Sequence, residues 1–151
     1  MTDSGQWGSE WHSRVLVDEI LALFRDADSV LDCTLGGGGH SAALLSIGAT
    51  VTAIDRDPEA VREARNRLAA FEATGRFRVI LGNFSEADTL LSDQSRKFDG
   101  ILADLGVSSH QIDDSARGFS FREGAPLDMR MSDTSVDDGA SILNHASESE
   151  L

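Results

Sequence analysis

The sequence predicts an α/β fold in which four parallel strands form one sheet that carries helices on both faces. Between residues 29 and 107, apolar runs of strand length alternate with stretches of helical length. The runs are almost continuously apolar, as is typical of parallel strands that are buried on both faces. The chain has 151 residues, 40% of them hydrophobic. That length suits a single core, so a second complete domain is not expected.

The first part of the pattern predicts a helix, a strand and a second helix. The run SVLDCT (29–34) is a short buried strand that four glycines end. The run HSAALLSIG (40–48) is compatible with a helix closed by Gly48, because a left-handed backbone costs glycine little. Upstream, residues from Val15 to Phe24 repeat apolar side chains at the spacing of an amphipathic helix. These side chains are Leu16, Ile20, Leu23 and Phe24.

The second part predicts three more strands and the clearest helix of the chain. The run TVTAID (50–55) is β-branched and short, and FRVILGNF (77–84) and FDGILADLGV (98–107) are the other two strands. A polar, weakly helical link, residues 85–97, connects the last two. The clearest helix begins with Asp57 as N-cap and Pro58 at its first position. Its apolar residues at helical spacing are Val61, Ala64, Leu68 and Phe71.

The last third of the chain predicts a long loop and then an interrupted helix. Residues 108–131 are rich in Gly, Ser and charge, and loops of this length are more often functional than idle. Ser147 and Glu150 have the spacing of a capping box, about one turn before the sequence stops. So short a helix is not stable alone, and sheets of this kind usually have five or more strands. The pattern therefore predicts either a longer parent chain that has been cut here or a gene product that is an incomplete relative of one.

Composition limits the classes of function. The formal net charge is −13, from 26 acidic and 13 basic residues, which weighs against a large nucleic-acid footprint within this chain. The one cysteine, Cys33, excludes a disulfide framework and a cysteine metal site, so we expect no metal and a cytoplasmic location. No apolar stretch is long enough for a membrane span, and the N-terminus has no apolar signal core.

A glycine-rich turn and an acid after the second strand predict a nucleotide-type ligand. Gly36 to Gly39 join a strand to a helix, where glycine permits both a tight turn and close approach of a ligand to backbone N–H groups. Asp55 follows Gly36 by 19 residues and ends the second strand, where a carboxylate can accept both hydroxyls of a ribose. The alternatives are a turn without a ligand and an Asp55 that only caps a helix or faces solvent.

Asp32 distinguishes between two kinds of nucleotide. Residues 37–42 satisfy G-x-G-x-x-A, so the pattern alone also permits a dinucleotide such as NAD. Asp32 lies inside the first strand, four residues before Gly36, and its negative charge is unfavourable for a pyrophosphate. A ligand with an amine and a sulfonium beside adenosine suits that charge better. S-adenosylmethionine is such a ligand.

Further candidate residues fall at the same edge of the predicted sheet. Asp104 ends the fourth strand beside the topological switch, where open α/β sheets bind ligands. Phe84 follows the third strand, and either stacks on adenine or belongs to the core. His40 lies in the first turn of its helix, either as a cap or as a ligand contact.

Five segments of the chain together resemble one family, the ribosomal RNA small-subunit methyltransferase H or MraW family, over its N-terminal half. They are DCTLGGGGHSAALL (32–45), AIDRDPEAV (53–61), GNFSE (82–86), DLGVSSHQIDDSARGFSFREGAPLDMRMS (104–132) and LNHASESEL (143–151). The resemblance implies a Rossmann-like class I S-adenosylmethionine methyltransferase fold that is incomplete here. It also implies methyl transfer to the N4 amine of a cytidine in 16S rRNA of the small ribosomal subunit.

The resemblance also implies site residues and domain boundaries. Asp104 would be catalytic, and His110 replaces a proline that is usual in the family. Residues 1–14 would be a flexible tail, 15–136 a partial cofactor-binding domain and 137–151 the start of a truncated helical substrate-recognition domain. The remaining strands of the family are missing. The residues implied to contact the cofactor are Gly38, Gly39, His40, Asp55, Phe84, Asp104 and Gln111.

Three functions remain open from the residues. The first is the N-terminal part of the rRNA methyltransferase, binding cofactor weakly and transferring nothing alone; the second is a stand-alone, non-catalytic S-adenosylmethionine-binding module; the third is an NAD-linked oxidoreductase. An uncovered sheet edge also makes a homo-oligomer possible. The loop 113–132 offers arginines and aromatics suited to RNA, unless its acids pair with the arginines. The residues concerned are Arg117, Arg122, Arg130, Phe119 and Phe121, with the acids Asp113, Asp114, Glu123 and Asp128.

Overall fold

The computed structural model describes residues 16–92, 97–107, 109–121, 123–132 and 137–150. The chain divides into two compact units, Met1–Leu105 and Gly106–Leu151, each of which is described by itself. The predicted tail, residues 1–14, lies outside the described residues.

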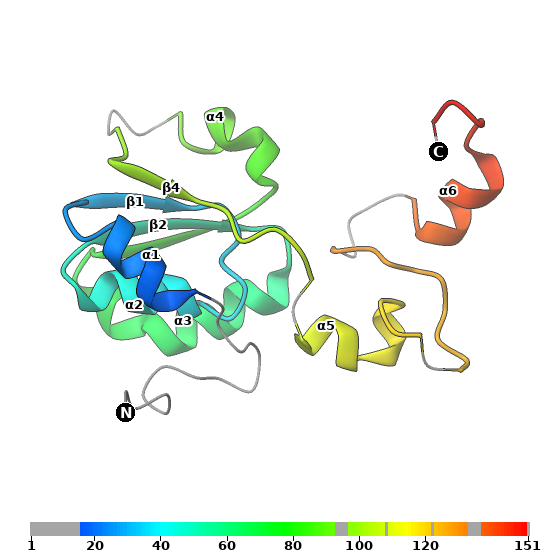
Figure 1. Ribbon diagram of the computed structural model, residues 1–151, viewed down its shortest axis with the longest axis horizontal. Coiled ribbons are helices and arrows are strands. Elements are labelled where there is room, and N and C mark those ends of the chain that lie inside the picture. Colours follow the sequence, from blue (N-terminus) through cyan, green and yellow to red (C-terminus); the bar gives the residue numbers. More distant parts are fainter. Residues whose placement is uncertain (1–15, 93–96, 108, 122, 133–136, 151) are drawn as a thin grey trace. The chain divides into compact units, whose positions relative to one another are not determined.

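The first unit contains the predicted sheet of four parallel strands (Figure 1). Its strands are β1 (Ser29–Asp32), β2 (Thr50–Asp55), β3 (Phe77–Leu81) and β4 (Gly100–Leu102). They are ordered β3-β2-β1-β4, so the chain moves outward from β1 to β3 and then returns to the other side of β1. The α/β class and the parallel sheet predicted from the sequence are therefore confirmed.

Three strands are shorter than predicted, because side chains end the ladders early. After β1, the N–H of Thr34 donates to the carboxylate of Asp32 at 3.1 Å and turns the chain toward the glycines. After β3, the side chain of Asn83 accepts the N–H of Ser85 and starts the short helix η1 (Phe84–Glu86). Along β4 the ladder with β1 stops at Asp32 and Leu102.

Three helices cover one face of the sheet and a shorter one covers part of the other (Figure 1). The first face carries α1 (Val17–Leu23), α2 (Gly39–Ser46) and α3 (Pro58–Ala73), and α4 (Ala87–Leu90) lies on the second. The core of the first face includes Val30, Leu44, Val51, Leu68 and Phe77, all at most 2% exposed. That of the second is smaller, with Leu31, Cys33 and Ile54.

Helix α3 begins as its sequence predicts. The side chain of Asp57 accepts the N–H of Glu59 at 2.9 Å, and Pro58 occupies the first position. Val61, Ala64 and Leu68 are buried against the sheet. A buried apolar stripe opposite a charged face is what holds such a helix in place.

The amphipathic pattern predicted for α1 is only half right. Ile20 and Phe24 pack against the core, but Leu16 and Leu23 are exposed. Leu16 precedes the helix in a left-handed conformation, and the ring of Phe24 lies against Gly100 of β4. The short helix therefore contacts the sheet through its last turn.

The second unit contains short helices where the sequence predicts a loop. These are α5 (Ser109–Asp113) and η2 (Ser115–Arg117), while α6 (Gly139–His145) lies beyond the predicted loop, where the start of a helical domain was expected. Asp114 and Asp138 cap η2 and α6, accepting N–H groups at 3.0 and 2.6 Å. The predicted loop over 108–131 is thus wrong in part, because local side-chain caps need no apolar periodicity.

Only the glutamate half of the predicted capping box near the C-terminus forms, because the N–H of Glu150 donates to the carbonyl of Ser147 and not to its hydroxyl. The carboxylate of Glu150 accepts the N–H of Ser147 at 2.8 Å and its hydroxyl at 2.7 Å. Residues 148–150 are a turn, as expected for so few residues.

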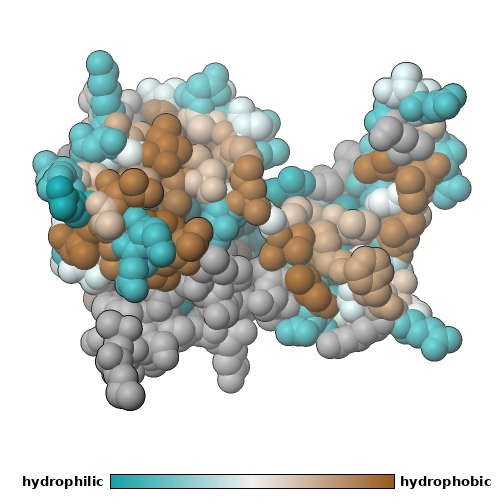
Figure 2. Space-filling model, viewed as in Figure 1, coloured by the Kyte–Doolittle hydropathy of each residue, from teal (hydrophilic) through white to brown (hydrophobic). Residues whose placement is uncertain are grey.

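The second unit has little core. Among its described residues only Ser132 is buried, and several large apolar side chains are exposed (Figure 2). These exposed residues are Val107, Ile112, Phe121, Leu127, Met129, Ile142 and Leu143.

None of the helices in the described part of the chain is long and apolar enough to cross a membrane.

Candidate functional site at the carboxyl edge of the sheet

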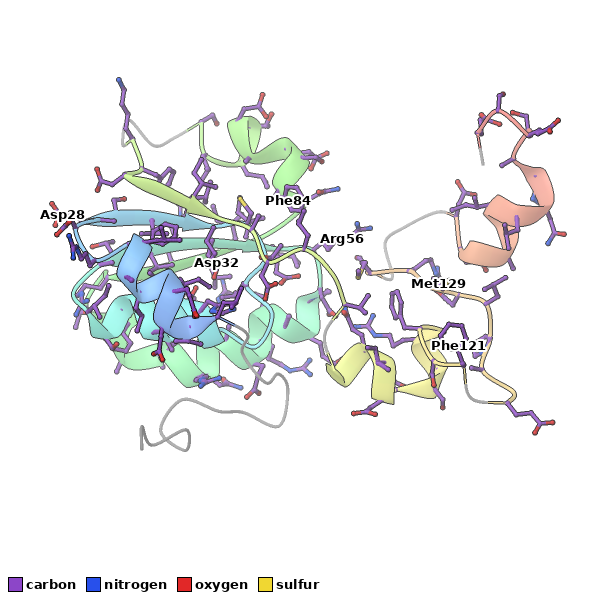
Figure 3. All side chains as sticks on the ribbon, viewed as in Figure 1. Asp28, Asp32, Arg56, Phe84, Phe121 and Met129 are labelled. Carbon is purple, nitrogen blue, oxygen red and sulfur yellow. The ribbon has the colours of Figure 1, made fainter. Side chains whose placement is uncertain are left out.

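The carboxyl ends of the strands bring the predicted acids to one edge of the first unit. Asp32 and Asp55 are the last residues of β1 and β2, and Asp104 follows β4 by two positions. The topological switch lies between β1 and β4. Figure 3 shows Phe84 and Arg56 at this edge and Asp28 at the opposite one.

Two glycines of the turn have distinct structural roles. Gly38 caps α2 with φ +74°, and a Cβ there would lie 3.2 Å from side-chain atoms of both Ala64 and Leu68. Gly36 has φ +50° and open space where a Cβ would stand. Glycine at position 38 therefore lets the turn pack on α3, while position 36 leaves the turn accessible to a ligand.

The carboxylate of Asp55 holds the glycine turn. One oxygen accepts the N–H of Gly36 at 2.7 Å, and the other accepts the N–H of Asp57 at 2.9 Å. The carboxylate also accepts a backbone hydrogen bond from Arg56, and its four lone-pair sites leave acceptor capacity for a ligand. Burial raises the pKa of Asp55, and these backbone hydrogen bonds oppose that rise.

The backbone of the turn is less available to a ligand than the sequence predicts. Gly36 donates its N–H to Asp55, and Gly38 donates its N–H to the carbonyl of Leu35 at 2.9 Å. The guanidinium of Arg67 also reaches the carbonyl of Gly37 at 3.2 Å. Two of the N–H groups predicted to face a ligand are therefore used within the protein.

Asp32 is a buried carboxylate with two donors. Only 1% of the residue is exposed. The hydroxyl of Ser41 donates to one oxygen at 2.7 Å, and the N–H of Thr34 donates to the other at 3.1 Å. Burial raises the pKa of Asp32 to about 6 despite these donors, and the charges of Asp55 and Asp104 raise it further.

The substitution Asp32→Asn is expected to remove a pH dependence of stability. Between the ordinary pKa of 3.8 and the folded-state pKa of about 6, the folded chain holds a proton that the unfolded chain has lost. The free energy of unfolding should therefore fall as pH rises through this window, by about 3 kcal/mol in all. Asparagine keeps one acceptor and adds a donor for Ser41 without titrating.

Urea denaturation of both proteins at about pH 4 and about pH 7 measures this difference. General repulsion among the acidic residues affects both proteins, so the comparison isolates Asp32. Equal pH dependence in the two proteins would contradict the assignment.

The side chains of His40 and Asp104 are in contact with each other. The Nε2 atom of His40 lies 3.3 Å from a carboxylate oxygen of Asp104. His40 is buried in the first turn of α2, whereas the carboxylate of Asp104 is partly exposed. The N–H of Asp104 donates to the hydroxyl of Thr34 at 2.7 Å. His40 thus contacts the carboxylate of Asp104, and Thr34 holds its backbone N–H.

Phe84 is not a core residue. It begins η1 after β3, is 42% exposed and belongs to neither buried cluster. Of the two roles left open by the sequence, the core role is therefore not what the structure shows. Stacking on adenine stays a prediction.

Gln111 and the arginines belong to the second unit. The amide of Gln111 contacts the sulfur of Met131 at 3.5 Å, and its role toward the cofactor stays a prediction. The guanidinium of Arg130 donates two hydrogen bonds to the carboxylate of Asp128, at 2.8 and 2.7 Å, and its backbone N–H donates a third at 3.0 Å. These bonds lower the pKa of Asp128 to about 2. This pairing favours the structural role of that arginine. Arg122 lies outside the described residues.

Thr34 and Ser41 are site residues that sequence reasoning missed. Both are small hydroxyl residues next to predicted acids, and no spacing rule distinguishes them from ordinary turn residues. In the part of the chain that the structure describes, no group of three His, Cys, Asp or Glu side chains is arranged to hold a metal.

Sequence comparison places this geometry among methyltransferases. A family model described as the MraW methylase family matches residues 9–151. The ribosomal RNA small subunit methyltransferase H of Gemmatimonas aurantiaca is 51% identical over 148 residues, which is 98% of this chain and 47% of that protein. The protein of the same name from Rhizobium etli is 44% identical, over 99% of this chain and 43% of its own length. The chain spans less than half the length of these relatives.

Solved structures show the same fold. An O-methyltransferase from Bacillus cereus, in complex with SAH, matches 67% of this chain and 49% of its own, with a TM-score of 0.54 and 17% identity. An SAH-bound methyltransferase from Podospora anserina matches 62% of this chain and 41% of its own, with a TM-score of 0.51 and 18% identity. These likenesses show that the chain has the Rossmann-like fold of these two structures.

Proposed function

The chain belongs to the MraW methylase family, and from this we propose that it binds S-adenosylmethionine and forms the cofactor-binding part of an rRNA methyltransferase. One observation carries the proposal. Asp32, Asp55 and Asp104 converge on the turn between β1 and α2, at the topological switch of the sheet. A ligand with a ribose, an ammonium and a sulfonium matches this set of acceptors.

The same carboxylates disfavour NAD. A pyrophosphate needs bare N–H groups and a positive helix end. Here Gly36 and Gly38 already donate their N–H groups within the protein, and Asp32 lies under the turn. The G-x-G-x-x-A match at residues 37–42 therefore does not favour a dinucleotide.

The proposed roles of the residues follow from their positions. Asp55 accepts the ribose hydroxyls with the lone pairs that Gly36 and Asp57 leave, and exposed Phe84 stacks on the adenine. The glycine turn, including Gly38, Gly39 and His40, lies under the methionine part. Gln111 would complete the cofactor contacts.

We further propose that the acceptor is the N4 amine of a cytidine in 16S rRNA, which would place the protein in the cytoplasm. Bound S-adenosylmethionine supplies the methyl group and a sulfur that leaves with the electron pair of the broken C–S bond. The amine nitrogen forms the new C–N bond and loses a proton. In this proposal the carboxylate of Asp104, at the topological switch and in contact with His40, accepts a hydrogen bond from the amine, holds it in line and takes up the proton that it loses. The base must leave its stack to reach it.

Calorimetry with the 151-residue chain tests the cofactor. We expect S-adenosylmethionine to bind weakly, while NAD gives no heat of binding. Binding of NAD but not of S-adenosylmethionine would contradict the proposal.

Methyl transfer from labelled cofactor to small ribosomal subunits tests the reaction. We expect none from the chain alone, and transfer when these residues are joined to the remaining part of the Gemmatimonas aurantiaca relative. Asp104→Ala in that fusion should abolish transfer. If the fusion binds cofactor but transfers nothing, a non-catalytic module is favoured instead.

A further inference from the structure

The switch between β1 and β4 is bridged by a side chain that has no assigned role. The ladder between the two strands ends at Asp32 and Leu102, apart from one hydrogen bond from the N–H of Cys33 to the carbonyl of Leu102 at 2.8 Å. Beyond it the strands separate, β1 into the glycine turn and β4 toward Asp104. The hydroxyl of Thr34 accepts the N–H of Asp104 at 2.7 Å and continues the connection by one bond.

Thr34 is itself held by a hydrogen bond to Asp32. Its N–H donates to Asp32, whose other carboxylate oxygen receives the hydroxyl of Ser41 in α2. Asp32 and Ser41 are both at most 1% exposed, so this anchor belongs to the packed interior. A hydroxyl on such an anchor has a fixed position from which to hold a neighbouring strand end.

Two contacts of Asp104 bear on the position of its carboxylate. It follows β4 by two residues, and its carboxylate is 43% exposed. His40 contacts the carboxylate from α2, while Thr34 fixes the backbone N–H. The two contacts act on different atoms of Asp104, and both influence where its carboxylate lies relative to the glycine turn.

We propose that Thr34 is a positioning residue for Asp104: its hydroxyl holds the end of β4 against the turn and so sets the crevice in which the cofactor and the accepting amine meet. The proposal rests on the proposed function. A threonine that only filled space would serve equally well as valine, because the two side chains have nearly the same shape.

Substitution of Thr34 separates the two roles. Thr34→Val should weaken the affinity for S-adenosylmethionine about tenfold, and Thr34→Ser, which keeps the acceptor, should stay within about twofold. Thr52→Val is the matched control, since it makes the same change at a buried threonine in the middle of β2. It should leave the affinity unchanged.

A double-mutant cycle tests whether Thr34 acts through Asp104. In an Asp104→Ala background, Thr34→Val should weaken binding by less than about twofold further, because the side chain to be positioned is gone. The positioning role would be overturned if Thr34→Val still weakened the affinity about tenfold in the Asp104→Ala background. It would also be overturned if Thr34→Val did not weaken the affinity of the otherwise unsubstituted chain.

Hydrogen exchange gives a reading that needs no ligand. The Asp104 amide should exchange about tenfold faster in Thr34→Val and at the native rate in Thr34→Ser. Unchanged exchange in Thr34→Val would show that the hydroxyl does not hold Asp104. If the exchange result is as expected but the unsubstituted chain does not bind S-adenosylmethionine, the proposed function fails instead.

Discussion

Asp55→Ala is expected to reduce the affinity for S-adenosylmethionine by at least about a hundredfold, because hydrogen bonds to a charged group contribute about 1.5 to 3 kcal/mol each. The substitution removes the proposed acceptor of two ribose hydroxyls. It also releases the N–H groups of Gly36 and Asp57, so the glycine turn loses its link to the start of α3. Both effects act against binding. Calorimetry at saturating ligand measures the loss.

Asp28→Ala is the matched control for this loss of a carboxylate. Asp28 is exposed and lies at the opposite edge of the sheet (Figure 3). The two variants have the same net charge, so a general electrostatic effect would appear in both. We expect Asp28→Ala to bind as the unsubstituted chain does. Native-like affinity in a folded Asp55→Ala protein would refute the ribose contact.

Gly38→Ala is expected to lower the free energy of unfolding by about 2 to 4 kcal/mol. The left-handed backbone at φ +74° accounts for part of this cost. The rest comes from the new methyl group, which would stand 3.2 Å from Ala64 Cβ and Leu68 Cδ1 and force α2 away from α3. Urea denaturation measures the change.

Gly75→Ala separates the two parts of that cost. Gly75 has the same φ of +74°, but a Cβ there meets nothing within 4 Å. It should therefore show only the backbone cost, about 1 kcal/mol after the stiffer unfolded chain is allowed for. Equal losses at the two positions would mean that the packing of the glycine turn on α3 contributes nothing.

The sheet was predictable because its strands are nearly continuous apolar runs, and α3 because a cap, a proline and an apolar stripe coincide. Elements with weaker signals were not. Leu16 and Leu23 fit a helical period, yet α1 is too short to turn both toward the core. Helices α5 and η2 have no apolar stripe, and α6 was anticipated only as the beginning of a helical region. Periodicity detects burial, and these elements bury little.

The acids of the site were predictable from topology alone, since residues that end parallel strands meet at one edge. What those acids contact was not. The sequence does not reveal that Asp55 uses both oxygens on backbone N–H groups, or that Thr34 reaches across to Asp104. Such contacts depend on where the chain turns after each strand. For this reason, the prediction that the N–H groups of the turn face a ligand was wrong for Gly36 and Gly38.

The central claim is that the turn between β1 and α2 holds S-adenosylmethionine, with Asp55 on its ribose. The most direct test is a titration of the ¹⁵N-labelled chain with this compound, followed by amide resonances. We expect the largest shifts on Gly36 to His40 and on Asp55, Phe84 and Asp104, while the amide of Asp28 at the far edge stays in place. Saturation of a folded sample with no movement of the Gly36 to His40 resonances would contradict it.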